Sequence, residues 1–295
     1  MALNKTVFRT RALSALLFVA IMLTGLLWNF WSFFLLFSAI HFGCWYEYQH
    51  IIGRIDGEYT KINGFHKYGV MIAGWCIMLY ATDSSYRVGG LTLHQAGYWL
   101  GLIFLFALPL LEIILVRNIN FKNIGRSFLG LLYISLSWGL LTALRSSLHF
   151  ELFNHYVDMG QYLVLLIICS IWINDTMAYI VGSLIGRTPL TSISPKKTWE
   201  GTLGGIILAI LVMGLAGYLI NPETDWQSVF VWMTIAAIAA IAGTFGDILE
   251  SKLKRMADIK DSGRILPGHG GFLDRFDSLL LATPFVWLYI VLFVK

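Results

Sequence analysis

Residues 161–184 read QYLVLLIICSIWINDTMAYIVGSL, a run in which Asp175 is the only charged side chain. Such a run can cross a bilayer as a helix, because about 20 apolar residues span its hydrocarbon core. The rest of the chain has the same character. Of its 295 residues, 57% are hydrophobic and 13% are charged, whereas about a quarter are charged in a typical soluble domain. We therefore expect an all-α, polytopic integral membrane protein.

Further apolar runs, separated by polar clusters, predict eight more transmembrane helices. The nine expected helices cover 12–28, 30–49, 68–82, 96–116, 127–144, 161–184, 201–220, 228–249 and 278–294. We expect the first to be a retained helix and not a cleaved signal, because no small-residue cleavage site follows it. Residues 1–160 then hold helices one to five, and residues 161–295 hold helices six to nine with two polar loops, 185–200 and 250–277.

Cationic residues test this map independently, because short cytoplasmic loops accumulate Lys and Arg. With nine spans and a cytoplasmic N-terminus, 18 of the 21 Lys and Arg residues lie on the cytoplasmic side. Topology thus accounts for most of the net charge of +4, and no nucleic-acid partner is needed. We expect a bacterial-type inner membrane protein. The three cysteines, at positions 44, 76 and 169, lack metal-ligand spacing and indicate neither a disulfide framework nor a zinc site.

The longest polar stretch, residues 250–277, mixes acidic and basic side chains. A loop that only connects helices needs neither this length nor both signs of charge. Its carboxylates suit a hard cation such as Mg2+, which takes one or two protein carboxylates and completes its shell with water and substrate phosphates. Lys and Arg would neutralise the remaining phosphate oxygens. The composition therefore indicates metal-bridged phosphate binding.

Two acidic groups flank this stretch. If the preceding helix continues into the loop, one of its faces carries Asp247, Glu250, Ser251 and Lys254. Asp274 and Asp277 share a face where the last helix begins. The alternative interpretation is a surface salt-bridge ladder at 247–254 and charge complementarity to a helix N-terminus at 274–277. Asp247 fits that alternative poorly, because an unpaired carboxylate near the membrane boundary is costly.

Two further segments could hold an anion. The turn at 267–271, Pro-Gly-His-Gly-Gly, can present backbone N–H groups to an anion, and His269 could act there as a proton donor, a phosphate partner or a simple turn residue. Ser194, Lys196, Lys197 and Thr198 precede a helix N-terminus, which also favours anions. Positive-inside bias alone would explain the lysines but not the hydroxyl groups beside them.

Three acidic residues are expected within the hydrocarbon. Asp175, next to Asn174, lies toward the cytoplasmic half of its helix and could approach the same pocket. Glu47 and Glu112 have no neighbouring motif, so we interpret them as structural acids paired with a basic or hydroxyl group. Closely packed helices six and seven are expected from the small residues Gly182, Gly186, Gly201, Gly204 and Gly205.

These polar residues form a recognisable pattern, Ser251-x2-Lys254-Arg255-x4-Lys260-Asp261-x5-Pro267-x-His269-Gly270-Gly271-x2-Asp274-Arg275-x-Asp277. The pattern resembles the signature of the phosphatidate cytidylyltransferase (CDP-diacylglycerol synthase) family. Segments 174–179, 194–201 and 246–251 resemble that family too, so the resemblance is strong over 172–278. It implies that CTP and phosphatidate react to give CDP-diacylglycerol and pyrophosphate at a cytoplasm-facing site in the bilayer.

The resemblance also implies roles for individual residues. Mg2+, with a second cation left open, would be held by Asp247 and Asp274, with Asp277 and Asp175 as secondary candidates. The groups expected to act in catalysis are Lys254, Arg255, Lys260, Asp261, His269 and Arg275. The groups expected to bind the substrates are Ser194, Lys196, Lys197, Thr198, Ser251, Gly270 and Gly271.

Two rival functions stay open at this point, as does a homodimer. A CTP-dependent kinase, or a cytidylyltransferase acting on another lipid, would keep the nucleotide motifs and change the acceptor pocket. An ion-coupled transporter could use Asp175, Glu47 and Glu112 as a relay. Transporters place coupling acids near the bilayer midplane, however, whereas most acids here crowd one loop.

Overall fold

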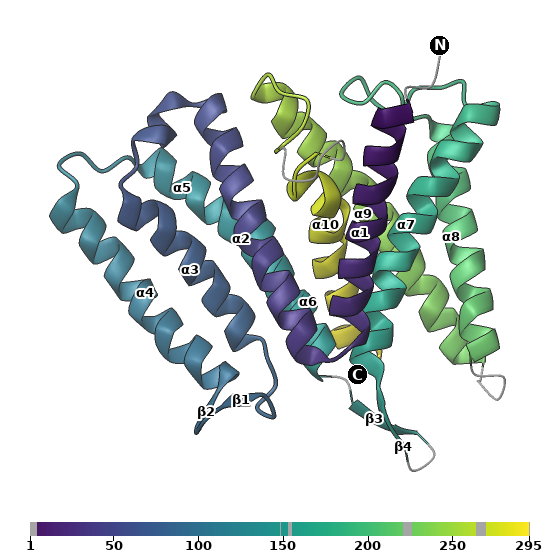
Figure 1. The fold of residues 1–295 in the computed structure, drawn as a ribbon, viewed down its shortest axis with the longest axis horizontal. Helices are drawn as coiled ribbons and strands as arrows, with labels where there is room; N and C mark the ends of the chain where they lie inside the picture. The colour runs from purple at the N-terminus through teal and green to yellow at the C-terminus, as the bar shows by residue number, and fades with distance from the viewer. Residues whose placement is uncertain (1–4, 148, 153–154, 221–225, 264–269, 295) are drawn as a thin grey trace.

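The computed structural model describes residues 5–147, 149–152, 155–220, 226–263 and 270–294. Figure 1 shows the helices running side by side between two ends of the molecule. The helices are α1 (Lys5–Leu27), α2 (Phe30–Ile55), α3 (Gly64–Tyr80), α4 (Leu93–Leu115), α5 (Phe121–Gly130), α6 (Ser137–Ser147), α7 (Met159–Ile185), α8 (Trp199–Ile220), α9 (Trp226–Met256) and α10 (Leu273–Tyr289). A π-helical turn, Leu131–Leu136, joins α5 to α6, and another, Ile290–Val294, follows α10.

The expected all-α membrane protein is confirmed. Because α5, its π-helical turn and α6 are continuous, the described residues contain nine long helical segments at the nine expected places, and a short 3-10 helix, Gly57–Lys61, follows α2. Six of these segments are long and apolar enough to cross a membrane: Leu93–Leu115, Phe121–Ser146, Met159–Ile185, Trp199–Ile220, Trp226–Met256 and Leu273–Val294. Helices α1 to α3 do not meet that measure within the described residues, so the number of crossings stays a prediction.

Two short β-hairpins lie at one end of the helical bundle, one between α3 and α4 and the other between α6 and α7 (Figure 1). Strands β1 (Arg87–Val88) and β2 (Leu91–Thr92) pair antiparallel, as do β3 (His149–Leu152) and β4 (His155–Asp158). The first hairpin turns at Gly89, whose φ of 62° lies in the left-handed region that glycine adopts without strain. The expectation of a purely helical chain did not include these hairpins.

The helix ends beside the polar loops differ from those expected. Helix α9 continues to Met256 rather than 249, which confirms that it carries the 247–254 face out toward the loop. It ends where Asp258 adopts a left-handed φ of 53° and the Ile259 amide donates to the Lys254 carbonyl at 3.0 Å, a Schellman-type cap. Helix α10 begins at Leu273 rather than 278, so Asp274 lies in its first turn.

Glycines bring the C-terminal helices into backbone contact. A Cβ on Gly201 would lie 2.6 Å from the Ala178 carbonyl oxygen, and one on Gly205 would lie 2.6 Å from the Asn174 carbonyl oxygen. The expected close packing of the sixth and seventh helices, now α7 and α8, is therefore confirmed. Helices α9 and α10 approach in the same way at Gly246, where a Cβ would lie 2.5 Å from the Asp277 carbonyl oxygen.

An aromatic cluster forms the core beneath the start of α10. The rings of Phe37 on α2 and Trp138 on α6 lie 5.1 Å apart, and Phe276 on α10 lies 5.6 Å from Trp138. All three side chains are buried. Packing of this kind fixes how the N-terminal helices sit against the C-terminal ones, since offset and edge-on aromatic pairs have specific geometry.

Candidate active site

Three connections meet at one end of the bundle. Figure 1 shows the α7–α8 connection and the α9–α10 connection at the same end as the start of α1 and the α2–α3 connection. The α7–α8 connection folds back on itself, because the Leu190 amide donates to the Lys197 carbonyl at 2.7 Å and the Trp199 amide donates to the Thr188 carbonyl at 2.9 Å. Glu200, in the first turn of α8, accepts from the backbone amides of Arg187 and Thr188 and secures this loop. The loop therefore has a defined shape beside α9.

Lys197 and Asp247 form an ion pair across this end of the molecule. Their side chains are 27% and 32% exposed, so the pair remains accessible to a ligand. Ser251, one turn further along α9, donates its hydroxyl to Asp247 at 3.2 Å. Two segments fifty residues apart in the sequence thus place a cation, a carboxylate and a hydroxyl together.

Two more carboxylates from α7 and α10 lie near this pair. Asp175 is exposed on α7 and interacts electrostatically with both Lys197 and Asp247. Asp277 is buried on α10 and is subject to the negative charges of Asp247 and Asp175. The side-chain amide of Asn174 donates to Asp175 at 3.3 Å. Three helices and the α7–α8 connection therefore contribute to one acidic cluster, called the acidic pocket below, in which Lys197 pairs with Asp247.

A second, more enclosed cluster surrounds Lys254. Its ammonium pairs with Glu250 on α9 and with Asp274 on α10, at 2.6 Å from Asp274 Oδ1. The Lys254 and Asp274 side chains are only 14% and 10% exposed, and that of Glu250 is fully buried. Asp274 Oδ2 accepts from the Ser262 amide, the Ser262 hydroxyl and the Gly271 amide, each at 2.8 Å. This cluster ties α9, the following loop and α10 together.

These contacts separate the residues expected to hold a metal into two groups. Asp274 already has four donors from the protein, so its carboxylate acts as an anchor at the start of α10. Asp247 and Asp175 keep an exposed surface. The alternative considered for 247–254 was a surface salt-bridge ladder. The Lys254–Glu250 pair links residues four apart on α9, but it is enclosed and not on the surface.

Sequence reasoning missed a residue that the structure places at this site. Glu47 on α2 accepts from the Ser262 hydroxyl at 2.7 Å, from the Phe272 amide at 2.9 Å and from the Leu273 amide at 2.8 Å. Its side chain is buried. The expectation that Glu47 pairs with a hydroxyl group is confirmed, but the idea that it stands apart from the motifs is wrong. Its acidic character within an apolar helix was the only signal in the sequence.

The remaining expected residues lie on the same connections and helix ends as these two clusters. Arg255, Lys260, Asp261 and Arg275 are exposed, as is Lys196. The Ser194 carbonyl accepts from the Lys197 amide at 3.1 Å, and the Thr198 hydroxyl accepts from the Gly201 amide at 3.2 Å. Gly270 has a left-handed φ of 83° in the turn that enters α10, and the Gly271 amide donates to Asp274. His269 lies outside the described residues.

The oxygen-rich pocket fits a hard cation. Its donors are the carboxylates of Asp175 and Asp247, which keep exposed surface. Asn174 turns its amide nitrogen toward Asp175, whereas its buried Oδ1 faces Gly205 of α8. No group of three or more His, Cys, Asp or Glu side chains in that part of the chain is arranged to hold a metal by itself. One or two carboxylates are what Mg2+ usually takes from a protein, since substrate phosphates and water complete its shell.

Comparison with known proteins assigns the chain to a family. Residues 9–293 match the model of the cytidylyltransferase family. The chain belongs to that family. The phosphatidate cytidylyltransferase of Bacillus subtilis (strain 168) is 32% identical over 224 residues, which cover 74% of this chain and 76% of that protein. The enzymes of the same name from Rickettsia felis and Staphylococcus haemolyticus are 35% and 36% identical, and the alignments cover 59% and 57% of this chain and 74% and 68% of theirs.

The match to the cytidylyltransferase family extends over the N-terminal helices as well as the motif-bearing ones. This extent agrees with the contact between Glu47 and the motif loop, because the N-terminal half contributes directly to the site.

Proposed function

We propose that this cytidylyltransferase transfers the cytidylyl group of CTP to phosphatidate, giving CDP-diacylglycerol and pyrophosphate. The observation that carries the proposal is the accessible Lys197–Asp247 pair with Asp175 beside it, assembled from three separate segments of a membrane-embedded bundle. The names of the relatives specify the same reaction.

The arrangement suits a reaction between two polyanions. The phosphate of phosphatidate is already an anionic nucleophile, so the protein needs no strong base; it must align two repelling groups and stabilise charge, as in phosphoryl transfer generally. Lys197 can exchange its pairing with Asp247 for a phosphate oxygen. The exposed Arg255, Lys260 and Arg275 can hold the triphosphate and the lipid phosphate.

The acidic side of the pocket has a complementary role. We propose that Asp247 and Asp175 hold Mg2+, with Asn174 positioning the Asp175 carboxylate through its amide nitrogen. When bound, Mg2+ would neutralise phosphate oxygens and polarise the α-phosphorus for attack. Asp274 and Glu250 instead hold Lys254 and the start of α10 in position.

We also propose how the molecule lies in the membrane. Nine crossings with the two motif-bearing connections, α7–α8 and α9–α10, in the cytoplasm would put most Lys and Arg on the inner side of a bacterial-type inner membrane. CTP then reaches the site from the cytoplasm, and phosphatidate reaches it from the inner leaflet. In this arrangement 161–295 is the catalytic region, to which Glu47 is added from α2.

The rival functions gain no support from the contacts. Glu47 is bound to the α9–α10 loop, whereas Glu112 lies 3.0 Å from His66 between α3 and α4, so Asp175, Glu47 and Glu112 form no continuous relay. A CTP-dependent lipid kinase is distinguished by its products, which would be a phospholipid and CDP.

The test is an assay of the purified protein with CTP, phosphatidate and Mg2+. We expect CDP-diacylglycerol and pyrophosphate, with turnover abolished by EDTA and restored by added Mg2+. Asp247→Asn and Asp175→Asn should each lower kcat at least about a hundredfold, because each removes a carboxylate that would hold the Mg2+ needed to neutralise the phosphate oxygens. Asp83→Asn, at the hairpin end of the molecule, is the matched control and should stay active. Near-normal kcat in either pocket variant would remove that residue from the metal site, and formation of CDP would identify a kinase instead.

A further inference from the structure

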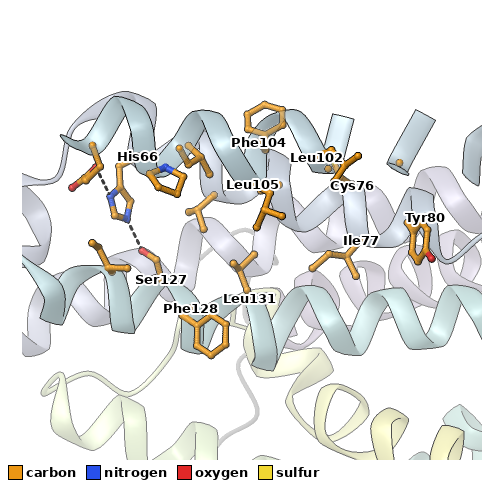
Figure 2. A pocket seen from close by; sticks show the side chains of 18 of the residues that line it. His66, Cys76, Ile77, Tyr80, Leu102, Phe104, Leu105, Ser127, Phe128 and Leu131 are labelled. Carbon is orange, nitrogen blue, oxygen red and sulfur yellow. Dashed lines mark hydrogen bonds and ion pairs between the residues drawn. The ribbon is translucent and has the colours of Figure 1, made fainter. Parts of the chain in front are cut away.

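An apolar cavity of about 500 Å3 lies between α3, α4 and the helix formed by α5 and its π-helical turn. Its wall includes Val70, Leu105 and Leu131. Figure 2 shows it extending from His66, near the start of α3, to Tyr80, at the end of that helix. That length of helix corresponds to about 21 Å, which exceeds half of the roughly 30 Å hydrocarbon core. The shape and the lining of the cavity suit one long acyl chain.

A serine, a histidine and a carboxylate follow one another at one end of this cavity, and all three line it. Ser127 Oγ on α5 lies 2.8 Å from His66 Nε2, a contact that Figure 2 shows. His66 Nδ1 lies 3.0 Å from Glu112 Oε2 on α4. The side chains of His66 and Glu112 are 10% and 15% exposed. This is the arrangement of a nucleophile, a general base and a third group that orients the base.

The hydrogen bonds run in one direction through these groups. A carboxylate only accepts, so the Nδ1 atom of His66 carries the proton and donates to Glu112. Nε2 is then an acceptor, and the Ser127 hydroxyl donates to it. Ser127 Oγ in turn accepts from the Tyr59 hydroxyl, 3.0 Å away. The basic nitrogen of the imidazole therefore faces the serine O–H, as removal of that proton requires.

A second serine and histidine pair in this chain lacks two of these features. His41 Nε2 lies 3.0 Å from Ser135 Oγ, but His41 Nδ1 is buried and has no hydrogen-bond partner in the described part of the chain. Ser135 accepts from the Trp45 indole at 2.8 Å and is not among the residues that line the cavity. That pair has neither an orienting carboxylate nor a space for a ligand, whereas Ser127 has both.

The N-terminus of α3 lies at the same end of the cavity. Its N-cap residue, Asn63, makes no side-chain hydrogen bond to the first turn, and the first amides of a helix have no partner within the helix. Phe65 and His66 belong to that turn and line the cavity. A helix N-terminus stabilises negative charge, so these amides suit the oxyanion that forms when an ester carbonyl is attacked.

We propose that Ser127, His66 and Glu112 form a second catalytic site, which hydrolyses long-chain acyl esters of membrane lipids. The acyl chain fills the apolar cavity, and the ester carbonyl lies beside Ser127. A polar hollow of about 490 Å3, which Glu112 also lines, admits water. Ser127 and His66 act on the reacting atoms. Glu112 is a positioning residue, because it acts through the imidazole.

The proposed reaction has two steps. Ser127 Oγ forms a bond to the ester carbonyl carbon while its proton passes to His66 Nε2; the bond from that carbon to the lipid alcohol oxygen then breaks, and this oxygen takes the proton from Nε2. Water next attacks the acyl-serine and gives a proton to Nε2, and the proton returns to Ser127 Oγ as the fatty acid leaves. Ester and water thus give fatty acid and alcohol.

This ester site is separate from the acidic pocket. Gly130, in the helix that carries Ser127, packs on Trp45 of α2, whereas Glu47 of α2 contacts the α9–α10 loop. Helix α2 thus lies between the two sites. Ester hydrolysis uses no CTP, so the proposal does not depend on the proposed transfer reaction.

The first test treats the purified full chain, in detergent micelles, with a long-chain alkyl fluorophosphonate, a reagent that reacts with activated serines. Peptide mapping should find the reagent on Ser127. The protein should also hydrolyse 4-nitrophenyl palmitate, and Ser127→Ala should lower this rate at least about a hundredfold. Ser135→Ala is the matched control and should keep both reactions. Thermal unfolding of the variants checks that they are folded.

A second test concerns the carboxylate. Glu112→Gln should lower kcat for the palmitate ester at least about a hundredfold with little change in KM, because an amide no longer fixes the tautomer of His66. Glu112→Asp keeps the carboxylate and should recover part of the loss. Equal losses in the two variants would contradict the positioning role of Glu112.

A third test concerns the cavity. Gly101→Leu should lower kcat/KM for 4-nitrophenyl palmitate about tenfold, because a Cβ there meets only Cys76 Cβ at 3.7 Å and the new side chain occupies the space of the acyl chain. Hydrolysis of 4-nitrophenyl acetate, which has no long chain, should be unchanged. Ala107→Leu, on the same helix but outside the lining, should hydrolyse both esters normally.

Three results would overturn the proposal. The first is a fluorophosphonate that leaves Ser127 unmodified. The second is palmitate ester hydrolysis that is absent from the unsubstituted chain or undiminished in Ser127→Ala. The third is loss of ester hydrolysis in Asp247→Asn, which would place that chemistry in the acidic pocket. Hydrolysis retained in Asp247→Asn supports a second site whether or not the transfer assay succeeds.

Discussion

Glu47 shows how a single buried carboxylate can organise a distant loop. Both of its oxygens accept from the segment that enters α10, and the Ser262 hydroxyl lies between Glu47 and Asp274, at 2.7 and 2.8 Å. A hydroxyl has one proton to donate, so the two carboxylates share it. The position of α10, and with it Asp277, therefore depends on a residue of α2.

Glu47→Gln should weaken this connection. The amide would place an NH2 group opposite backbone donors and leave a buried donor unpaired, at a cost of about 1–3 kcal/mol. We expect a lower melting temperature, faster hydrogen exchange at the Phe272 and Leu273 amides, and reduced turnover. The same measurements on Asp83→Asn provide the comparison. Unchanged exchange at these two amides would show that the carboxylate does not hold the loop.

Individual site residues differed in how far the sequence could reveal them. Asp247 and Asp175 could be predicted because a charge within or beside an apolar helix is costly and needs a reason. Ser262 and Glu47 could not be linked, since 215 positions separate them and neither carries a periodic signal. The motif around Asp274 predicted a metal ligand. The donors to its carboxylate come from Lys254, Ser262 and Gly271, and the sequence alone could not show that the folded loop brings them there.

At the scale of elements, α9 approaches the α10 backbone most closely at Gly246, one turn from Gly243, which also faces Ser278. A Cβ on Gly246 would meet the Asp277 carbonyl oxygen at 2.5 Å and Ser278 Cα at 3.0 Å, both of which belong to the backbone and cannot rotate away. Any side chain there must push the two helices apart, and the neighbouring Asp247 and Asp277 would move with them.

Gly246→Ala should therefore destabilise the protein by about 1–3 kcal/mol, as overpacking typically does, and should lower turnover. Gly125→Ala on α5 is the matched control, because a Cβ there meets nothing within 4 Å and alanine favours a helix by up to about 1 kcal/mol. Thermal unfolding in detergent and the CTP assay measure both effects. Equal stability of the two variants would contradict the close approach of α9 and α10.

The places of the helices follow from the sequence better than their ends do. Apolar runs between polar clusters locate the nine long helical segments of the described chain. Helix α9 ends at Met256 because Asp258, two residues later, adopts a left-handed φ, which is a local feature. Helix α10 begins at Leu273, where the amide donates to Glu47 of α2, which is a tertiary contact. The turn between α1 and α2 is similarly fixed by a capping box, in which Asn29 and Ser32 exchange hydrogen bonds at 2.9 and 3.1 Å.

For the whole molecule, the proposed orientation makes a direct prediction. Gly90→Cys, in the first hairpin, should react with a membrane-impermeant maleimide added to cells whose inner membrane is intact and whose outer layers let the reagent through. Ser192→Cys, in the α7–α8 connection, should react only after the inner membrane is permeabilised. The unsubstituted chain gives the background, in which Cys44 and Cys76 are buried. Labelling of Ser192→Cys from outside would reverse the orientation and move the site away from CTP.

The arrangement of the helices around one another was not accessible from the sequence. Hydrophobic runs define spans, but nothing in them indicates that α2 lies against both the α9–α10 loop and the helix that contains Gly130. Charge asymmetry predicts which connections share a side of the membrane, and it agrees with the α7–α8 and α9–α10 connections lying at the same end as the α2–α3 connection (Figure 1).

The bridge between Glu47 and Ser262 has a consequence for recombination between relatives. A hybrid that joins the first helices of one such protein to the last helices of another inherits its two bridging groups from different parents. Such a hybrid can build the loop entering α10 only if one parent supplies the acid and the other the hydroxyl. Among relatives, a substitution at the position of Glu47 is therefore expected to be accompanied by a change at the position of Ser262, although most of the motif lies in the C-terminal half.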